Sequence, residues 1–585
     1  MKNKTLIISI LSLLITSCTS KKIPEVTVGE VNSHIGYLAS DNLKGRYPGT
    51  TGDSLTLHYI AEEFKNAGLN SFDQDYLQRF DFLSGIVPSE KNLLIFWGNR
   101  FEQEKDFYPM SFSAGGSFEA PIVFCGYGFD FKTDEILHDD YSTVDPEGNW
   151  AMILRGEPAE HNDYIERSGD RYKALLAQDK GAKGVLLVSG TEFSTSDFLD
   201  TSIKREPEID IPVIQLTRET ANTILKSSGH TIEELEKQSK KENLTGISIS
   251  RKLVAELKLE KVYTSTGNVI GYVAGDDKKN GNWIVVGAHH DHLGMGGTGN
   301  SSRAPDTIAV HNGADDNASG VAAILELAEF FSSRENRPSE NIIFVTFGAE
   351  EKGILGSRHF VENPPIELNK ISLMINIDML GRMRRDSGLQ VGGVGTFNDS
   401  KEIIKDINQN YGLKLSYSDA GYGPSDHASF YASDIPVLFF STGAHSDYHT
   451  PFDDPDSLNY EGLALGTRFI SDVIEKVDSR EESIVFQEAG PKRRSSRSFR
   501  NMVTLGIMPD VSGSEENGMK VLAVTDGKPA DLGGMKKGDI ITAIEGKNVD
   551  NVYDYMYRLK QLKAGQPIVV SVRRKNEKID LLIQL

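Results

Sequence analysis

Histidine and carboxylate side chains recur in five short segments of this chain, each beside an apolar run that predicts a strand. In chain order these are segments 287–292, 313–317, 348–351, 376–379 and 448–451. Nitrogen and oxygen ligands without a thiolate suit Zn²⁺ or a similar divalent cation in a catalytic site. The set is large enough for two cations and one further carboxylate that acts as a base, which is what a two-metal hydrolase needs.

Residue type and position predict which side chains bind the two cations. His289 would bind the first cation together with Asp378, whose charge at the end of an apolar strand needs a partner. Asp315 is the predicted bridging ligand, because a carboxylate has two oxygens. Capping of the following helix is the alternative interpretation of this Asp-Asp-Asn sequence. The second cation would take Glu351 and His449.

Three further side chains are predicted to support the reaction. Glu350 is the candidate general base that takes a proton from the attacking water. Asp291 can accept a hydrogen bond from His289 and fix the tautomer of its ring. Tyr448 can place its hydroxyl beside the substrate carbonyl and stabilise an oxyanion. Three nearby histidines are predicted not to be ligands: His290, His292 and His427.

The elements that must position these residues alternate in type between residues 259 and 478. Apolar runs at 283–288, 341–347 and 371–377 predict buried strands, and 320–331 has the pattern of a helix. Such alternation indicates an α/β sheet covered by helices on both faces. Ligands of these sheets collect outside the carboxyl ends of the strands, which is where the five segments lie.

The overall composition limits the class of protein. With 585 residues and roughly 100–200 residues per domain, the chain should form three or four domains. Its 63 basic and 84 acidic residues give a net charge of −21, which argues against a nucleic-acid partner. If Cys18 carries lipid, the second cysteine, Cys125, has no disulfide partner, and its strand-like surroundings predict a small buried side chain.

The N-terminus has the pattern of a targeting segment. Lys2 and Lys4 precede an apolar run at 6–15, which is too short to span a bilayer as a helix. Small residues then lead to Cys18, as in a bacterial lipoprotein signal that is cleaved before a lipidated cysteine. This predicts an exported lipoprotein held at the outer membrane, facing the periplasm or the cell surface. A plain secretory signal is the alternative.

The five segments, extended to 286–294, 312–320, 347–351, 376–382 and 448–453, resemble the M28 family of metallopeptidases, and 38–50 is similar to the opening of many members. The resemblance implies a phosphorylase/hydrolase-like mixed sheet flanked by helices, with two zinc ions. It also implies a cis peptide after the bridging acid, between Asp315 and Asp316. The family's ligands, base and orienting acid fall on the residues already named: His289, Asp315, Glu351, Asp378, His449, Glu350 and Asp291.

Two other regions resemble known modules. Segments 124–128, 183–187 and 211–214 are similar to the protease-associated (PA) domain that interrupts some M28 enzymes. The C-terminal region resembles a PDZ domain, a module that binds chain ends by adding a strand to a sheet edge. Its carboxylate-binding loop would be Thr504, Leu505, Gly506 and Ile507.

These observations predict a domain plan and an activity. The plan is a signal at 1–17, a tether at 18–26, a peptidase domain at 27–104 and 259–480, a PA insert at 105–258, a linker at 481–500 and a PDZ domain at 501–585. The predicted activity is zinc-dependent removal of N-terminal residues from peptides. A carboxypeptidase, a cyclase or another M28-type hydrolase, and a non-catalytic receptor on the same fold, are the alternatives. The basic run at 492–497 is expected to be solvated, with contact to anionic lipid as a second interpretation.

Overall fold

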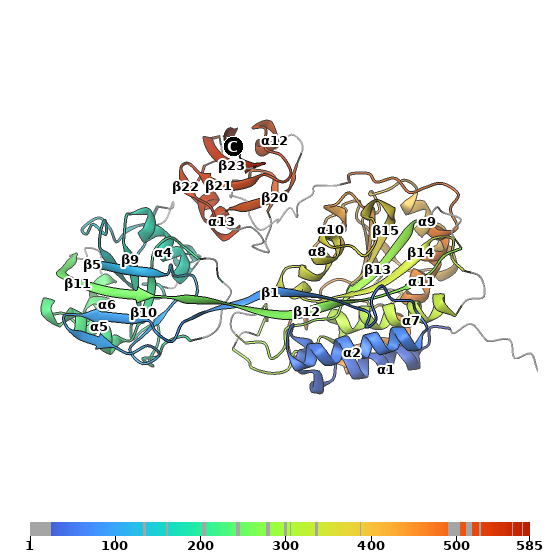
Figure 1. Ribbon diagram of the computed structural model, residues 1–585, viewed down its shortest axis with the longest axis horizontal. Coiled ribbons are helices and arrows are strands. Elements are labelled where there is room, and N and C mark those ends of the chain that lie inside the picture. Colours follow the sequence, from blue (N-terminus) through green and yellow to red (C-terminus); the bar gives the residue numbers. More distant parts are fainter. Residues whose placement is uncertain are drawn as a thin grey trace, which may run out of the picture.

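Three units make up the protein, two of them joined by a long two-stranded ribbon and the third placed above the gap between them (Figure 1). The computed structural model describes residues 25–585 apart from 133–135, 160–161, 166, 202–205, 207, 241–245, 277–280, 298–300, 305, 334–336, 387, 490–502, 510–517, 526–527, 551, 564 and 576. The predicted signal, Cys18 and the basic run therefore lie outside the described residues. Within the described residues, no helix has both the length and the apolar character needed to cross a membrane.

The first unit is built on a mixed sheet of eight strands. In spatial order they are β1 (Leu77–Pro88), β12 (Leu259–Val273), β14 (Asn341–Phe347), β13 (Trp283–His289), β15 (Ile371–Ile377), β18 (Val437–Ser441), β16 (Leu389–Gly392) and β17 (Leu415–Tyr417). Strands β14, β13, β15 and β18 are parallel to their neighbours in this run, so their carboxyl ends meet at one edge. The apolar runs are buried almost throughout, as the sequence predicted.

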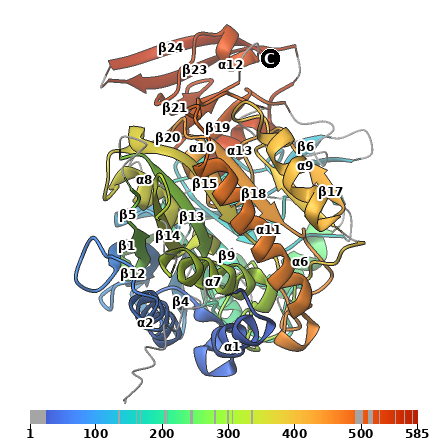
Figure 2. The same cartoon turned by 90° about the vertical axis from the view of Figure 1, so that its right-hand side faces the viewer.

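Helices cover both faces of this sheet, and each face has its own apolar core (Figure 2). On one face lie α1 (Val28–Leu38), α2 (Thr51–Asn66), α7 (Gly320–Ser332) and α11 (Tyr460–Asp478), with α9 (Ser400–Tyr411) packed on α11. On the other lie α8 (Leu355–Glu362) and α10 (His427–Tyr431). The predicted mixed α/β sheet flanked by helices is confirmed.

The second unit contains another eight-stranded sheet. Its spatial order is β3 (Asn99–Phe101), β2 (Leu93–Phe96), β11 (Ile247–Leu257), β5 (Gly116–Phe124), β8 (Trp150–Leu154), β9 (Gly184–Val188), β10 (Val213–Leu216) and β4 (Phe107–Pro109). Its other elements are β6 (Asp130–Lys132), β7 (Leu137–Asp139), α3 (Asn162–Ile165), α4 (Asp170–Asp179), α5 (Arg218–Leu225) and α6 (Ile232–Ser239). Cys125 is free and fully buried in this unit, as predicted.

Strand pairing divides the first two units earlier in the chain than the sequence suggested. Strands β2 and β3 pair into the second sheet through β11, so the predicted boundary at residue 105 falls inside that sheet. The physical link between the units is the antiparallel pair of β1 and β12, in register from Leu77 opposite Val269 to Pro88 opposite Leu259. This pair is the ribbon seen in Figure 1.

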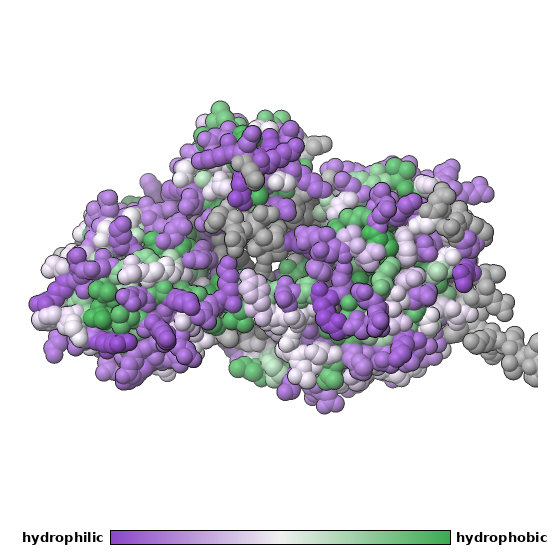
Figure 3. Space-filling view, viewed as in Figure 1, coloured by the Kyte–Doolittle hydropathy of each residue, from purple (hydrophilic) through white to green (hydrophobic). Residues whose placement is uncertain are grey.

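The third unit is a small β-rich body that packs on the second. Its elements are β19 (Ile507–Pro509), β20 (Met519–Val524), α12 (Pro529–Leu532), β21 (Ile540–Ile544), β22 (Lys547–Asn548), α13 (Val552–Lys560), β23 (Pro567–Arg574) and β24 (Glu577–Gln584). Helix α13 faces α4, where Arg171 lies 2.6 Å from Asp554 and Arg558 lies 2.5 Å from Asp179. The three units together expose a largely hydrophilic face (Figure 3).

The described start of the predicted linker packs against the first unit. Gln487 donates its backbone N–H to Thr396 O at 2.7 Å, and the backbone N–H of Ala489 lies 3.0 Å from the Tyr431 hydroxyl. Phe486 also contacts the ring of Tyr431. Residues 486–489, which the domain plan placed in a linker, are therefore anchored to the first unit.

Candidate metal centre

Polar side chains converge where the parallel strands of the first sheet end. His289 is the last residue of β13, and Asp378 follows β15 directly. A turn after β14 carries Glu350 and Glu351, and His449 lies in the loop after β18. The sequence therefore predicted correctly which strand ends come together.

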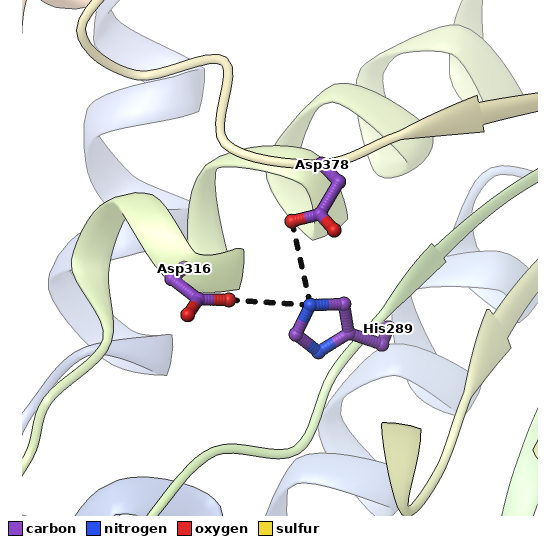
Figure 4. Close-up of side chains that lie close together, drawn as sticks. All are labelled: His289, Asp316 and Asp378. Carbon is purple, nitrogen blue, oxygen red and sulfur yellow. Dashed lines mark ion pairs between the residues drawn. The ribbon is translucent and has the colours of Figure 1, made fainter. Parts of the chain in front are cut away.

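One group of possible ligands surrounds His289 (Figure 4). Its Nε2 atom lies 3.2 Å from Asp316 Oδ1 and 3.4 Å from Asp378 Oδ1. The three side chains are buried, with ligand atoms within 4.8 Å of one another. The two carboxylates thus approach a single ring nitrogen, and a cation placed among these three atoms would be bound by all of them.

A second group surrounds the other oxygen of Asp316. His449 Nε2 lies 3.2 Å from both Asp316 Oδ2 and Glu351 Oε1. His292 Nδ1 lies 2.9 Å from Glu351 Oε1 and 3.7 Å from Asp316 Oδ2. Asp316 therefore presents one oxygen to each group, which is the geometry of a bridging carboxylate.

The predicted bridging residue, Asp315, is not part of either group. Its Oδ1 accepts hydrogen bonds from the Gly381 N–H at 2.6 Å and the Ser319 hydroxyl at 3.1 Å, so it holds neighbouring turns together. The prediction was wrong by one residue because the turn points the second acid of the pair at the cluster. Asp453 fixes that turn by accepting the backbone N–H groups of Asp315 and Asp316, both at 3.0 Å. The cis peptide likewise lies one residue later than expected, between Asp316 and Asn317.

The three histidines predicted not to be ligands have different surroundings. His292 is fully buried and part of the second group, so its position contradicts the prediction that it is not a ligand. His290 is also buried, but its Nδ1 lies 3.1 Å from the Thr346 hydroxyl and its Nε2 3.6 Å from Asp53, away from both groups. His427 stacks on the ring of Phe439 and belongs to neither group.

The ligand atoms lack the hydrogen bonds that buried polar atoms normally have. Among the described residues, Asp316 Oδ2, Glu351 Oε1, Asp378 Oδ1 and both ring nitrogens of His292 are inaccessible and have no hydrogen-bond partner. Leaving such charged groups unpaired is costly. Two divalent cations would satisfy these atoms, and the donor set of imidazole and carboxylate is the one zinc uses in catalytic sites.

The electrostatics of the two groups also call for positive charge. Burial opposes ionisation of Asp316, but His292, His289 and His449 outweigh it and bring the pKa of Asp316 well below its ordinary value. Burial would lower the pKa of His449, yet the neighbouring carboxylates of Asp316 and Glu351 raise it to about 10. Without metal, protons on His289 and His449 would balance the carboxylates, and a cation would take over that charge.

The pKa values of the predicted base, Glu350, and of its neighbour Glu351 are shifted in opposite directions. Burial, together with Glu351 and Asp426, raises the pKa of Glu350 well above its ordinary value, although His289 opposes this. Burial also disfavours the charged form of Glu351, but His292 and His449 lower its pKa to about 2. Adjacent carboxylates whose pKa values are pushed apart in this way can take separate roles in catalysis.

The two supporting residues lie close to the cluster. Asp291 accepts the backbone N–H of Glu350 at 2.8 Å and that of Glu351 at 3.3 Å, so its carboxylate positions the turn that carries the predicted base. His289 Nδ1 is closer to the backbone oxygen of Asp291, at 3.2 Å, than to its carboxylate, at 3.9 Å. The ring of Tyr448 stacks on that of His449, with centroids 3.8 Å apart.

The backbone around the ligands is strained. Ala349, Met379 and His449 have φ angles of 56°, 62° and 58°, which side-chain-bearing residues rarely adopt. Ala349 precedes Glu350, Met379 follows Asp378, and His449 is itself a proposed ligand. Strain of this kind persists only where surrounding structure holds it, and it gathers at functional sites. At His449 the ring is also fixed, because Nδ1 lies 3.0 Å from Ser301 O.

Sequence reasoning missed two further acids of this region. Asp453 holds the bridging turn, and its only signal was its place in the 448–453 segment. Asp426 is fully buried, and burial raises its pKa to about 7. It follows Ser425, and its charge acts on that of Glu350.

Three family models match successive parts of the chain. The family model described as peptidase family M28 matches residues 268–474, that of the PA domain residues 118–224, and that of the PDZ domain residues 503–585. Aminopeptidase YwaD of Bacillus subtilis is 24% identical over 395 residues, which cover 66% of this chain and 72% of that protein. Probable lipoprotein aminopeptidase LpqL of Mycobacterium tuberculosis is 24% identical over 344 residues, 59% of this chain and 56% of that protein.

One solved structure completes the comparison. BSAP, a zinc aminopeptidase from Bacillus subtilis, aligns with a TM-score of 0.47 and 21% identity, covering 80% of this chain and 99% of that chain. The three family matches follow the three units in order, with the PA match inside the second sheet and the PDZ match on the third unit. The chain therefore contains a peptidase M28 domain, a PA domain and a PDZ domain.

Proposed function

We propose that this peptidase is a zinc-dependent aminopeptidase that removes N-terminal residues from peptides. The observation that carries the proposal is the position of Asp316, whose two oxygens face two separate ligand groups. One ion would be held by His289 and Asp378, and the other by Glu351 and His449, with Asp316 shared. His292 is placed to join the second group.

Bound zinc would supply Lewis acidity, which lowers the pKa of water and polarises a carbonyl. Glu350 then acts as the general base. Its raised pKa suits a group that accepts a proton from the attacking water and returns it to the leaving amine. Asp291 accepts a hydrogen bond from the backbone N–H of Glu350 and so helps to position the Glu350 carboxylate for proton transfer.

Tyr448 is proposed to donate a hydrogen bond to the oxyanion that forms at the carbonyl. Burial and the nearby acids, Asp316 first among them, raise the pKa of its hydroxyl, so the group remains protonated and able to donate. Its stacking on His449 keeps the side chain beside the second ligand group. Replacement by Phe should lower kcat while leaving the zinc content unchanged.

A substrate screen tests the specificity. Full-length protein loaded with zinc would be offered aminoacyl, N-blocked and C-terminal chromogenic peptides. Cleavage confined to substrates with a free N-terminus supports the proposal. Hydrolysis of only the N-blocked peptides would contradict it, and release of C-terminal residues would favour the carboxypeptidase alternative.

The role of the base is tested separately. Glu350→Gln keeps the size of the side chain but cannot accept the proton, so turnover should fall by about a hundredfold or more. Zinc content should stay at the wild-type level, because the substituted residue is not a proposed ligand. Turnover close to that of the wild type would show that another group is the base.

The flanking regions suggest where and with what the enzyme works. We propose that Cys18 is lipidated, which would tether the exported enzyme to a membrane; the mycobacterial relative is named a lipoprotein aminopeptidase. Cys18→Ser should abolish incorporation of labelled fatty acid and release the enzyme into the soluble fraction.

The loop at Thr504, Leu505, Gly506 and Ile507 of the PDZ domain would receive the C-terminus of a peptide.

A further inference from the structure

A short segment near the N-terminus lies against three loops of the metal centre. It comprises residues 41–53, from the helical turn Asp41–Arg46 to the first turn of α2, and we call it the N-terminal clasp. The loops are 289–294 after β13, 312–316 before α7, and 350–352 after β14. All three carry proposed ligands or the proposed base, but the clasp itself supplies none of them.

Arg46 forms the main contact between the clasp and the loops. Its guanidinium is buried, with 1% of the residue exposed. Nε donates to His290 O at 2.8 Å, and Nη2 donates to Gly313 O at 3.0 Å. Nη1 donates to Asn312 O and to Leu38 O, both at 2.6 Å. One rigid side chain therefore spans the loop that carries His289 and the turn that carries Asp316.

Backbone contacts bring the clasp close to the first of these loops. Gly294 donates its N–H to Gly45 O at 3.0 Å. Gly45 has a φ of 68°, and a Cβ there would come within 2.5 Å of the carbonyl oxygens of Gly294 and His311. Only glycine fits this approach, because any side chain would push the clasp away from the loop.

Side chains make two further contacts. Asp53 Oδ1 lies 3.6 Å from His290 Nε2, next to the ligand His289. The ammonium of Lys352 lies 4.1 Å from the centre of the Tyr47 ring, which ties the clasp to the turn of Glu350. The clasp thus touches the supports of both ligand groups and of the base.

The bonds of Arg46 go to carbonyl oxygens, so its charge is not cancelled by a directly bonded carboxylate. Burial lowers the pKa of Arg46 to about 10, so the group remains positive at neutral pH. The negative charges that act on it most strongly are those of Asp316, Asp291 and Asp453. The guanidinium therefore lies behind the acidic cluster as a fixed positive charge.

We propose that Arg46 is a positioning residue of the metal centre, which sets the distance of Asp316 from His289 and His292 by holding their two loops through main-chain carbonyls. The proposal rests on the proposed metallopeptidase function, since that function gives the spacing its purpose. Arg46 touches neither substrate nor metal. Its effect reaches the chemistry through the backbone of His290 and Gly313, as supporting residues of metal sites commonly do.

The test uses full-length Arg46→Lys, which keeps the charge but cannot span four carbonyls with a planar fork. Zinc affinity of each site would be measured by competition with a chromophoric chelator. We expect binding at the weaker site to fall about tenfold or more. On a cleaved peptide, kcat should fall further than KM rises, because ligand geometry matters most in the transition state.

Arg155→Lys is the matched control, because Arg155 is also a buried arginine but lies in the PA domain. It should lower thermal stability and leave zinc affinity and kcat unchanged. Wild-type zinc affinity in folded Arg46→Lys would overturn the proposal. If that variant does not fold, Asp53→Asn decides: weaker zinc binding supports the clasp, and unchanged binding overturns it. Zinc affinity needs no turnover, so a wild type that binds two zinc ions without cleaving any peptide would contradict only the proposed function.

Discussion

The peptidase and PA domains share an architectural feature but use it in opposite ways. Both contain parallel strands whose carboxyl ends meet at one edge, and both place buried charged side chains there. At the PA edge, Arg155 lies 2.8 Å from Asp170, and Lys173 donates to Leu154 O at 2.8 Å. Glu236 there accepts the backbone N–H of Thr191 at 2.8 Å.

At the peptidase edge the same kinds of group approach one another as histidine–carboxylate ion pairs, without the hydrogen bonds of the PA edge. Asp316, Glu351 and Asp378 each have an inaccessible oxygen without a hydrogen bond among the described residues. A buried charge that is hydrogen-bonded stabilises the fold or costs little, whereas an unpaired one is kept only where something else requires it. The two edges therefore differ in how buried charge is satisfied: the PA edge hydrogen-bonds its charged groups, whereas the peptidase edge leaves acid oxygens that bound cations would satisfy.

The largest expected effect comes from breaking the shared ligand. Asp316→Asn removes the charge that faces both groups, so bound zinc should be lost on dialysis and turnover should fall about a thousandfold or more. Asp315→Asn is the matched control, because its carboxylate bonds to Gly381 and Ser319 instead. It should keep both ions and lose less than about tenfold in turnover. Zinc analysis and kcat on the same peptide measure both; the opposite ranking would restore Asp315 as the bridge.

The choice between these two acids shows how far sequence could go. Apolar runs that end at His289, Phe347 and Ile377 placed the strand ends correctly, because burial on both faces leaves a clear pattern. Which acid of an adjacent pair points inward depends on the turn. That turn is set by Asp453, which lies more than a hundred residues away in the chain, and no local pattern reports it.

His292 and Arg46 illustrate the same limit. A histidine in a Gly-rich loop is usually exposed, but this loop folds back under Gly45 and Arg46, so the ring of His292 is buried. The Arg46 side chain lies in a Gly/Pro loop that sequence alone marks only as irregular. In both cases a contact between segments more than 200 residues apart decides the environment. The PA boundary was misplaced for a related reason, since β2 pairs with the distant β11.

A matched pair of substitutions tests the comparison directly. Glu350→Gln should raise stability by roughly 1 kcal/mol at neutral pH, because burial raises the pKa of Glu350 and the charged form is costly there. Glu236→Gln should lower it by about 1–3 kcal/mol, because its amide cannot accept all the hydrogen bonds from Thr191 and Glu192. Denaturant unfolding of metal-stripped protein measures both. A loss of stability in both variants would remove the distinction between the two edges.

The last prediction concerns how the stability of the PA edge responds to pH. Burial lowers the pKa of Lys173 from 10.5 to about 7, so between these values the unfolded chain binds a proton that the folded protein does not. Stability should therefore rise with pH across this window, by roughly 1 kcal/mol per pH unit, and be unaffected by this group below it. Lys173→Met should remove that slope, whereas the exposed Lys252→Met should keep it. Equal slopes in denaturant unfolding of both variants between pH 7.5 and about 9.5 would mean that Lys173 stays charged, held by the carbonyls and rings around it.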